Sequence, residues 1–280
     1  MYGVIKIKIK SNMKKMLMFS IIASILAFFV FADSQFKSPT ACGGQWTSCS
    51  NAFADNANRA TASKDKSGRW NNYGFSTGNG AIIHNVTVRA DFFASRTNGF
   101  IDVKVSGDNG ATYGPSHIVG GNTAEQTFII DVTNDVAWAP SKLSNTNFRL
   151  NVTCIKQGGG PNPTCNLDWI PVNVVFTPFD FSVSASPNSD TVVQGNNATT
   201  TVTVTLLSGN SQTVSLFNSG CPTNALCSFN PSSGLPTFAS EFKVQTATQN
   251  GTTPLGTYNL TLSGFGDGKV RSTNYILTVS

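Results

Sequence analysis

Apolar and polar residues alternate with a period of two along most of the chain beyond residue 36. The alternation is clearest in residues 84–92, 101–105, 128–132, 148–154 and 170–176. Successive side chains of a β-strand point to opposite faces of its sheet, so this pattern predicts strands with one buried face. Polar, glycine-rich turn sequences separate these stretches. No segment beyond residue 36 carries apolar residues at helical spacing, and the sequence therefore predicts an all-β protein.

Composition changes abruptly near Thr177 and Pro178. All four tryptophans, both histidines and four of the six cysteines precede this point, whereas residues 179–280 hold one glutamate and many threonines and serines. Short alternating strands with polar turns are typical of antiparallel sandwiches, and the chain is long enough for two. We therefore expect two consecutive antiparallel β-sandwiches, over residues 37–177 and 179–280.

Residues 1–32 have the layout of a secretory signal peptide. Five lysines in the first 15 residues precede a run over residues 16–31 without a charged residue, and Ala32 offers a small residue for cleavage. The run has 16 residues, fewer than the ~20 that cross a hydrocarbon core. We expect cleavage near Ala32 and a secreted protein without a membrane span. An uncleaved N-terminal anchor is the alternative.

The excess positive charge belongs to this N-terminal segment. The chain has 19 Lys and Arg against 14 Asp and Glu. Because five of the lysines lie in residues 1–15 and no acid does, the remainder carries 14 residues of each sign. Nucleic-acid binding needs a basic stripe on the folded domain, and this balance argues against it.

The cysteines form close pairs along the chain. The pairs are Cys42 with Cys49, Cys154 with Cys165, and Cys221 with Cys227. An even number of cysteines in an oxidising compartment favours disulfides, and three local bridges are the simplest interpretation, although spacing alone does not fix the pairing. A zinc site would need Cys-x2-Cys pairs or nearby histidines, and the sequence has neither. We expect no metal and no cofactor.

Several segments of the second module share a known pattern. They are residues 180–187 (DFSVSASP), 192–195 (VVQG), 199–204 (TTTVTV), 227–234 (CSFNPSSG) and 254–262 (PLGTYNLTL). Together they resemble the immunoglobulin-like repeats of prokaryotic surface and secreted proteins. Modules of that family act as spacers or binding platforms, so the resemblance implies a sandwich without catalytic residues.

The first module shows a looser match. Its segments are Trp46-Thr47 and residues 50–55 (SNAFAD), 59–62 (RATA), 73–76 (YGFS), 147–152 (NFRLNV) and 167–172 (LDWIPV). They resemble a jelly-roll-like β-sandwich of prokaryotic secreted and phage tail proteins. This resemblance implies a fold and a surface location rather than an activity.

The ionisable residues offer little catalytic chemistry. A glycosidase needs two carboxylates across a cleft, yet Glu125 and Glu241 fall in different modules. His84 shares the phase of Val86, which favours a strand-end or packed imidazole, and His117 lies in a loop where a solvated histidine is expected. The sequence contains no nucleophile motif, phosphate loop or metalloprotease helix. We expect that the protein is not an enzyme.

Two aspartates have structural interpretations. Asp108 and Asn109 lie in a glycine-rich sequence that could accept calcium, but such a sequence is more often only a turn. Asp168 shares the phase of the apolar residues Ile170 and Val172. The simplest interpretation is a strand-entry carboxylate that accepts a hydrogen bond from a nearby backbone N–H.

Aromatic side chains are the candidate sugar-binding groups. Trp46 and Trp169 belong to the pattern of the first module, and we expect them to pack. Trp70 lies among polar residues beside Tyr73. Trp70 and Tyr73 are therefore the candidates for an exposed surface that stacks on a carbohydrate.

Asn-x-Thr triplets mark candidate glycosylation sites. They begin at Asn85, Asn151, Asn197, Asn250 and Asn259. Chains rich in Asn and Thr produce such triplets by chance, so their phase is the better evidence. Asn85, Asn151 and Asn259 alternate with apolar residues, and we expect them on the solvent face of their strands.

These observations favour a secreted, non-catalytic glycoprotein with a structural or adhesive role at the cell surface, where its partners would be surface proteins or glycans. The alternative is a carbohydrate-binding protein that uses the first β-sandwich. An enzyme ranks third.

Overall fold

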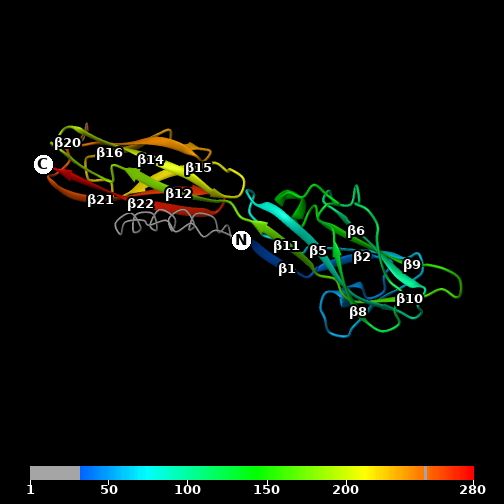
Figure 1. Cartoon of the computed structure of the whole chain (residues 1–280). Coiled ribbons are helices and arrows are strands. Elements are labelled where there is room, and N and C mark those ends of the chain that lie inside the picture. Colours follow the sequence, from blue (N-terminus) through cyan, green and yellow to red (C-terminus); the bar gives the residue numbers. More distant parts are fainter. Residues whose placement is uncertain (1–31, 249–250) are drawn as a thin grey trace, which may run out of the picture. The chain divides into compact units, whose positions relative to one another are not determined.

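The computed structural model describes residues 32–248 and 251–280, which form an all-β protein (Figure 1). The segment predicted to be a signal peptide lies outside the described residues up to residue 31, and so does the sequon residue Asn250. Two short 3₁₀ helices interrupt the strands, η1 (Cys49–Ala52) and η2 (Pro140–Leu143). Within the described ranges, no helix is long and apolar enough to cross a bilayer.

The first β-sandwich consists of a six-stranded and a five-stranded sheet. The six-stranded sheet, sheet A, has the order β1-β11-β5-β10-β3, and β8 also pairs with β5. Its strands are β1 (Asp33–Lys37), β3 (Ala60–Ser63), β5 (Ile82–Ala94), β8 (Gln126–Asp131), β10 (Thr164–Trp169) and β11 (Val172–Thr177). Sheet B has the order β2-β4-β9-β6-β7. Its strands are β2 (Ala41–Gly44), β4 (Ser67–Asn71), β6 (Gly99–Ser106), β7 (His117–Gly120) and β9 (Arg149–Lys156).

The period-two pattern places the core of this sandwich between the two sheets. In β5 the side chains of Val86 and Val88 are fully buried, and in β9 those of Leu150 and Val152 are fully buried. All belong to one hydrophobic cluster of the first sandwich. Burying each such side chain contributes about 1.5–3 kcal/mol. The alternation read from the sequence therefore sets the register of both sheets.

The second β-sandwich consists of a four-stranded and a five-stranded sheet. Sheet C has the order β12-β14-β18-β16, and sheet D the order β13-β22-β21-β15-β17. The strands of sheet C are β12 (Asp180–Ser186), β14 (Asn197–Ser208), β16 (Leu226–Asn230) and β18 (Phe238–Gln245). Those of sheet D are β13 (Ser189–Val192), β15 (Val214–Ser219), β17 (Ser233–Gly234), β21 (Gly256–Gly266) and β22 (Lys269–Val279). The strands β19 (Ala247–Thr248) and β20 (Gly251–Thr252) form a separate two-stranded sheet.

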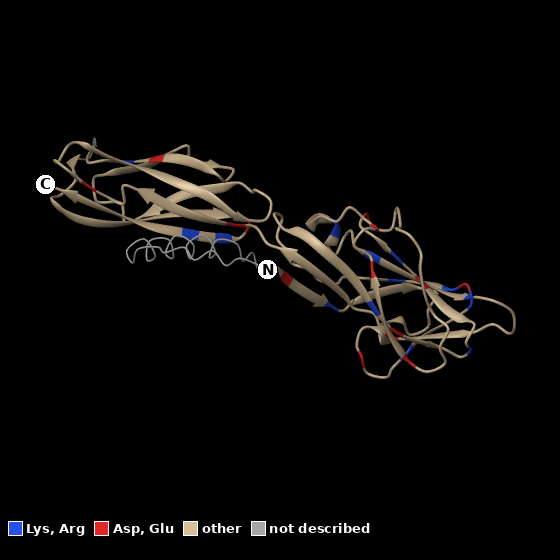
Figure 2. Cartoon of the chain, in the orientation of Figure 1, with Lys and Arg blue, Asp and Glu red and all other residues tan. Residues whose placement is uncertain are grey.

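The buried side chains of residues 179–279 form a second hydrophobic cluster. Phe181, Phe242 and Tyr275 are among its largest fully buried side chains. Charged residues are sparse on this sandwich and more frequent on the first one (Figure 2). The compositional change near Thr177 thus coincides with the end of β11 and the start of a separate core.

Two details differ from the sequence prediction. The first module was expected to start at residue 37, but sheet A begins with β1, in which Phe36 pairs with Asn173 of β11. The strand pairs were expected to be antiparallel, yet β13 runs parallel to β22. Only residues 187 and 188 separate β12 from β13. The chain therefore passes from sheet C to sheet D without reversing its direction.

Candidate functional site

Three disulfides join the cysteines as the sequence predicted. Cys42 pairs with Cys49, Cys154 with Cys165, and Cys221 with Cys227. The first ties β2 to η1, and the third closes the loop before β16. The second joins β9 of sheet B to β10 of sheet A across the core, where both cysteines are fully buried. This bridge fixes the two sheets to each other as well as closing a loop.

The proposed stacking residues are buried, so the expectation that Trp70 and Tyr73 form an exposed sugar-binding surface is wrong. Trp70 is 0% exposed, and its Nε1 donates to the Cys49 carbonyl at 3.1 Å. Tyr73 is 3% exposed, and its hydroxyl donates to the Ile170 carbonyl at 3.1 Å. Burial raises the pKa of Tyr73 well above its usual value. Both rings belong to the core.

Trp46 packs as expected. It is 5% exposed and meets Trp70 edge-on, with ring centroids 5.6 Å apart. Gly68 provides the space for this pair, because a Cβ at Gly68 would lie 2.6 Å from the Trp46 ring. Trp169 is half-buried, and the Arg89 guanidinium lies 4.6 Å from the centre of its ring. Both rings therefore pack against neighbouring side chains, as the sequence predicted.

An open groove of about 350 Å³ lies at the β2 edge of sheet B. We call it the basic groove. It is lined by Ala41, Cys42, Gly43, Arg69, Asn71, Asn109 and Arg149. Its two charged lining residues are Arg69 and Arg149. The outward positions of β2 carry only small side chains, and a Cβ built on Gly43 would meet no atom within 4 Å, so this wall of the groove is low.

The guanidinium of Arg149 is held in place by acceptors of its own chain. Its Nη1 donates to the carbonyls of Asn145 at 2.8 Å and Phe148 at 2.7 Å, and its Nη2 donates to Oδ1 of Asn109. Arg69 is exposed. Burial raises the pKa of Tyr113, and the positive charges of Arg69 and Arg149 oppose that rise. The phenol of Tyr113 therefore lies within the electrostatic reach of both arginines.

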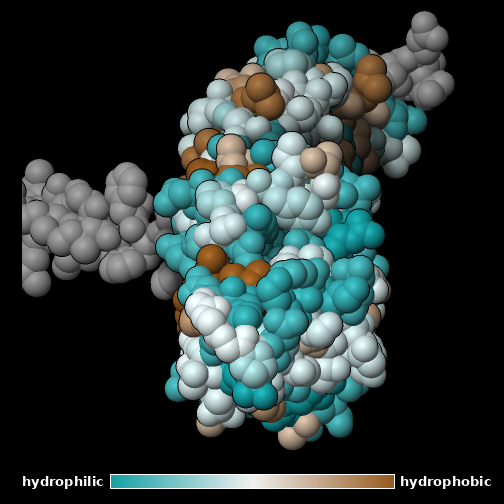
Figure 3. Space-filling view, turned by 90° about the vertical axis from the view of Figure 1, so that its right-hand side faces the viewer, coloured by the Kyte–Doolittle hydropathy of each residue, from teal (hydrophilic) through white to brown (hydrophobic). Residues whose placement is uncertain are grey.

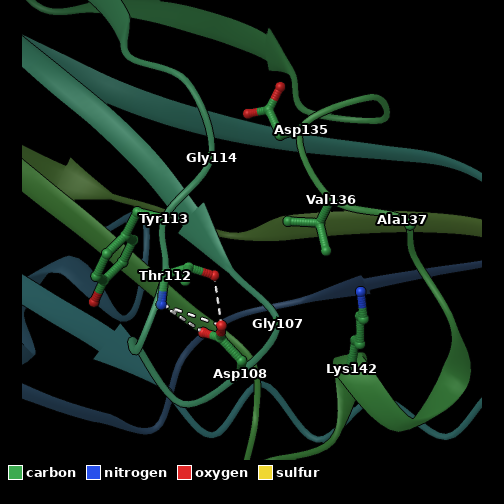
Figure 4. Close-up of a pocket in the computed structure, with 9 residues that line it drawn as sticks. All are labelled: Gly107, Asp108, Thr112, Tyr113, Gly114, Asp135, Val136, Ala137 and Lys142. Atoms are coloured by element: carbon green, nitrogen blue, oxygen red, sulfur yellow. Dashed lines mark hydrogen bonds between the residues drawn. The ribbon is translucent and has the colours of Figure 1, made fainter.

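A second cavity, of about 230 Å³, lies between the loop after β6 and the loop that leads to η2 (Figure 4). Figure 4 shows Asp108 and Lys142 on one side of it and Asp135 on the other. Asp108 is already engaged: Ser106 Oγ donates to its carboxylate at 2.6 Å, and the Thr112 hydroxyl and backbone N–H donate to it as well. These bonds, the Ser106 hydroxyl first, lower the pKa of Asp108 to about 2.

One wall of this cavity is a turn that the hydrogen bonds of Asp108 stabilise. Asn109 and Gly110 both have positive φ, which Asn and Gly tolerate best. The turn interpretation of this sequence agrees with the geometry, and the described residues contain no group of three or more His, Cys, Asp or Glu side chains able to hold a metal ion.

The two histidines lie at separate places of the first sandwich. His117 is half-buried, and its Nε2 lies 2.7 Å from Oδ2 of Asp135, so the expectation of a solvated histidine is wrong. His84 is exposed near the start of β5, and its Nε2 lies 2.7 Å from the Thr177 hydroxyl. A register shift between β5 and β11 at Val175 moves His84 out of the phase of Val86. The strand-end interpretation of His84 agrees with this position.

A cluster of opposite charges lies at β10 and β5 of sheet A. Asp168 is the extra residue of a β-bulge, because Leu167 pairs with Phe92 and Trp169 pairs with Asp91. Its carboxylate accepts a bond from the Ala57 backbone N–H at 3.3 Å, as the sequence predicted. The expected place at a strand entry is wrong, because Asp168 lies near the end of β10.

Two arginines pair with the acids of this cluster. Arg59 lies 3.4 Å from Asp168 and 2.7 Å from Glu125. Arg89 holds Asp91 through two bonds, of 2.9 and 2.7 Å. Burial raises the pKa of Glu125; Arg59 opposes this rise, and the neighbouring aspartates add to it. The cluster ties β5, β10 and the segment before β3 together.

The sequons face solvent where the structure describes them. Asn197 and Asn259 are exposed, whereas Asn85 and Asn151 are half-buried. Their apolar neighbours Val86, Val152 and Leu260 are fully buried, which agrees with the predicted phase. Asn85 also donates from Nδ2 to the Thr133 hydroxyl at 2.9 Å. Glycosylation of these residues stays a prediction.

The strand order of the sheets and the three disulfides define an all-β, disulfide-bonded β-sandwich protein. No protein-family model matches the chain, and no curated protein matches it.

Several solved structures are similar at low identity. The fibronectin(III)-like modules of Clostridium thermocellum CbhA match at 10% identity and a TM-score of 0.25, over 78% of this chain and 87% of that one. The N-terminal domain of the Streptococcus gordonii adhesin Sgo0707 matches at 8% and 0.27, over 89% and 76%. A Parabacteroides distasonis β-1,2-glucanase matches at 8% and 0.31, over 88% of this chain and 37% of that one. Scores this low do not assign a shared topology, so the jelly-roll and immunoglobulin resemblances stay predictions.

Sequence reasoning missed the basic groove. Arg69 and Arg149 lie far apart in the chain and meet because β4 pairs with β9. Each alternates with buried residues, Arg69 with Gly68 and Trp70, and Arg149 with Phe148 and Leu150. Outward arginines on two adjacent strands were the available signal, but the pairing of those strands was not predicted.

Proposed function

We propose that this protein is a secreted, non-catalytic protein with a structural or adhesive role at the cell surface. The observation that carries the proposal is the set of three disulfides, two in the first sandwich and one in the second. Disulfides form and persist in oxidising compartments outside the cytoplasm. The layout of residues 1–32 supports export on independent grounds.

The pairing of the acids supports a non-catalytic role. The carboxylates of Asp91 and Asp168 are buried and lie against the guanidinium groups of Arg89 and Arg59. Both carboxylates are therefore engaged by cationic partners within the fold. The surface in Figure 3 is mostly hydrophilic with scattered apolar side chains, as suits a protein exposed to water.

Export is tested by expressing the whole chain in a bacterium with its own N-terminus. We expect the protein in the extracytoplasmic fraction, starting near Asp33, with all six cysteines oxidised in non-reduced peptide maps. A reduced protein that stays in the cytoplasm and keeps residues 1–32 would overturn the proposal.

The adhesive role is tested with the oxidised protein coated on beads. The beads should be retained on immobilised cell-surface polysaccharide or on cells, and beads coated with a heat-denatured sample should not. Equal retention of the two samples would contradict adhesion through a folded surface.

A second candidate function is carbohydrate binding by the first sandwich. The basic groove favours it, because a shallow polar groove on a sheet edge is accessible to an extended saccharide, while the aromatic pair that first suggested this function is buried. A glycan array with the oxidised protein separates this function from a purely structural one.

A further inference from the structure

We propose that the basic groove binds a carboxylate-bearing saccharide, an oligosaccharide of uronic acid units. This inference rests on the proposed role in surface binding and names the ligand class of one site.

The groove carries positive charge without an acidic partner. Its lining contains two arginines and no carboxylate. Among the described residues, no ion pair involves Arg69 or Arg149. Asp108 lies in the turn that also contributes Asn109, and the bonds from Ser106 and Thr112 keep its carboxylate ionised. The two arginines of the lining outnumber this one negative charge, so an anion in the groove would meet a net positive charge.

The arginines also have donors left for a ligand. A guanidinium has five N–H groups, and the bonds of Arg149 to Asn145, Phe148 and Asn109 use three of them. The bonds fix the plane of the group, so the remaining N–H groups are oriented before a ligand arrives. Arginine binds carboxylates through two parallel bonds, which a planar and fixed group favours.

The surrounding groups suit a sugar better than a simple anion. Asn71 and Asn109 contribute amides, which can donate to or accept from hydroxyl groups. The volume of about 350 Å³ falls in the range of small-molecule sites, which is about 300–1,000 Å³.

The sheet continues this polar surface beyond the groove. Gly43 pairs with Arg69, Arg69 pairs with Asn151, and Asn151 pairs with Lys104. Side chains in register on neighbouring strands share a face of the sheet. The row therefore extends from the low wall at Gly43 past Arg69 to Lys104, whose ammonium lies 3.4 Å from the Asp102 carboxylate, so the positive charge of the row is centred on the groove arginines.

The test is a titration of the oxidised protein with three probes of equal length. The probes are a trigalacturonate, its methyl ester, and a neutral maltotriose. We expect the trigalacturonate to bind with an affinity that falls as salt rises, because the contact is between charges. The methyl ester and maltotriose should bind about tenfold more weakly or not at all.

Two variants and one control locate the site. Arg69→Gln should weaken trigalacturonate binding about tenfold. Gly43→Phe should abolish it by filling the groove, and it should fold, because a Cβ there meets no neighbour and the backbone is not left-handed. Arg96→Gln is the matched control, since Arg96 is exposed on the same sandwich outside the groove lining. Thermal melting of each variant confirms that it is folded.

Four outcomes would overturn the proposal. One is equal binding of the ester and the acid. Another is binding that Arg69→Gln and Gly43→Phe leave unchanged. The third is tighter binding of an acidic peptide of three glutamates than of trigalacturonate, which would assign the groove to protein ligands. If beads coated with wild type and beads coated with Arg69→Gln adhere equally well, this site is overturned but the adhesive role remains. If beads coated with wild type do not adhere at all, the adhesive role itself is overturned.

Discussion

Oδ1 of Asp168 lies 3.4 Å from Nη1 of Arg59, and the Asp168 side chain is 2% exposed. Neither atom has a hydrogen-bond partner. The contact is therefore an ion pair that does not have the geometry of a hydrogen bond. A bulge in β10 accompanies it, because Asp168 is the extra residue between Leu167 and Trp169 and so does not follow the alternation of its strand. The pair therefore depends on both charges being present.

Removing Arg59 should destabilise the protein more than removing the pair. Arg59→Met leaves a buried carboxylate without its counter-charge, which costs about 3 kcal/mol. Arg59→Met combined with Asp168→Asn removes both charges and should recover much of that loss. Urea denaturation of the two single variants and the double variant measures the coupling. Additive losses would mean that the two charges do not interact.

The disulfide between Cys154 and Cys165 should stabilise the protein more than that between Cys42 and Cys49. The first closes the longer loop, with a sequence separation of 11 against 7, and is fully buried between the sheets. Replacing both of its cysteines with Ser should cost about 2–3 kcal/mol. Melting curves of the two double-Ser variants provide the comparison, and a larger loss at Cys42 and Cys49 would contradict this ranking.

Substitutions on the two faces of one strand should differ sharply. Asn151→Gln and Asn259→Gln should change the free energy of unfolding by no more than about 0.5 kcal/mol, because both side chains face outward. Asn85→Gln loses the bond to Thr133 and should cost about 0.5–1.5 kcal/mol. Leu150→Asp buries an unpaired carboxylate and should prevent folding. Circular dichroism and urea denaturation measure these effects. If the Asn variants unfold while Leu150→Asp is tolerated, the strand register is off by one residue.

The carboxyl group of Asp108 should titrate with a pKa of about 2, below the usual 3.8, when followed by carbon NMR. The pKa is lowered in the folded state, so the bonds to Asp108 contribute stability above about pH 4. That contribution is lost as the pH falls toward 2. Ser106→Ala removes the main donor and should move the pKa back toward 3.8. An unchanged pKa in this variant would show that the Ser106 hydroxyl does not stabilise the charge.

Residues 179–280 should fold as a separate fragment. Their buried side chains form their own cluster, and the fragment keeps the disulfide between Cys221 and Cys227. We expect a β-type circular dichroism spectrum and one cooperative melting transition. A fragment that stays unfolded would mean that it needs the first sandwich.

The sequence predicted the fold class because alternation reports directly on which face of a strand is buried. It failed where the alternation is hidden. In β4 the buried positions are Gly68 and Trp70, and a glycine gives no apolar signal. In β10 both Leu167 and Asp168 are buried, because the bulge breaks the period of two.

The candidate site was predicted less well, for a different reason. The disulfides are local in the chain, so the simplest interpretation, three bridges between close cysteines, agrees with the structure. The basic groove depends on strand pairing, which brings distant residues such as Arg69 and Arg149 together. Trp70 lies beside polar residues in the sequence, and this suggested that it is exposed. In β4, however, Arg69 and Asn71 lie on the outer face of the strand and Trp70 lies on the buried face.

The register that pairs Arg69 with Asn151 and Asn151 with Lys104 also bears on how the protein must be produced. Asn151 begins an Asn-x-Thr sequon, so a eukaryotic expression host could attach a branched glycan between the two cationic side chains. Such a glycan would shield the groove sterically. Material from that host would then fail in a binding assay in which bacterial material succeeds, and Asn151→Gln would restore binding to the shielded sample.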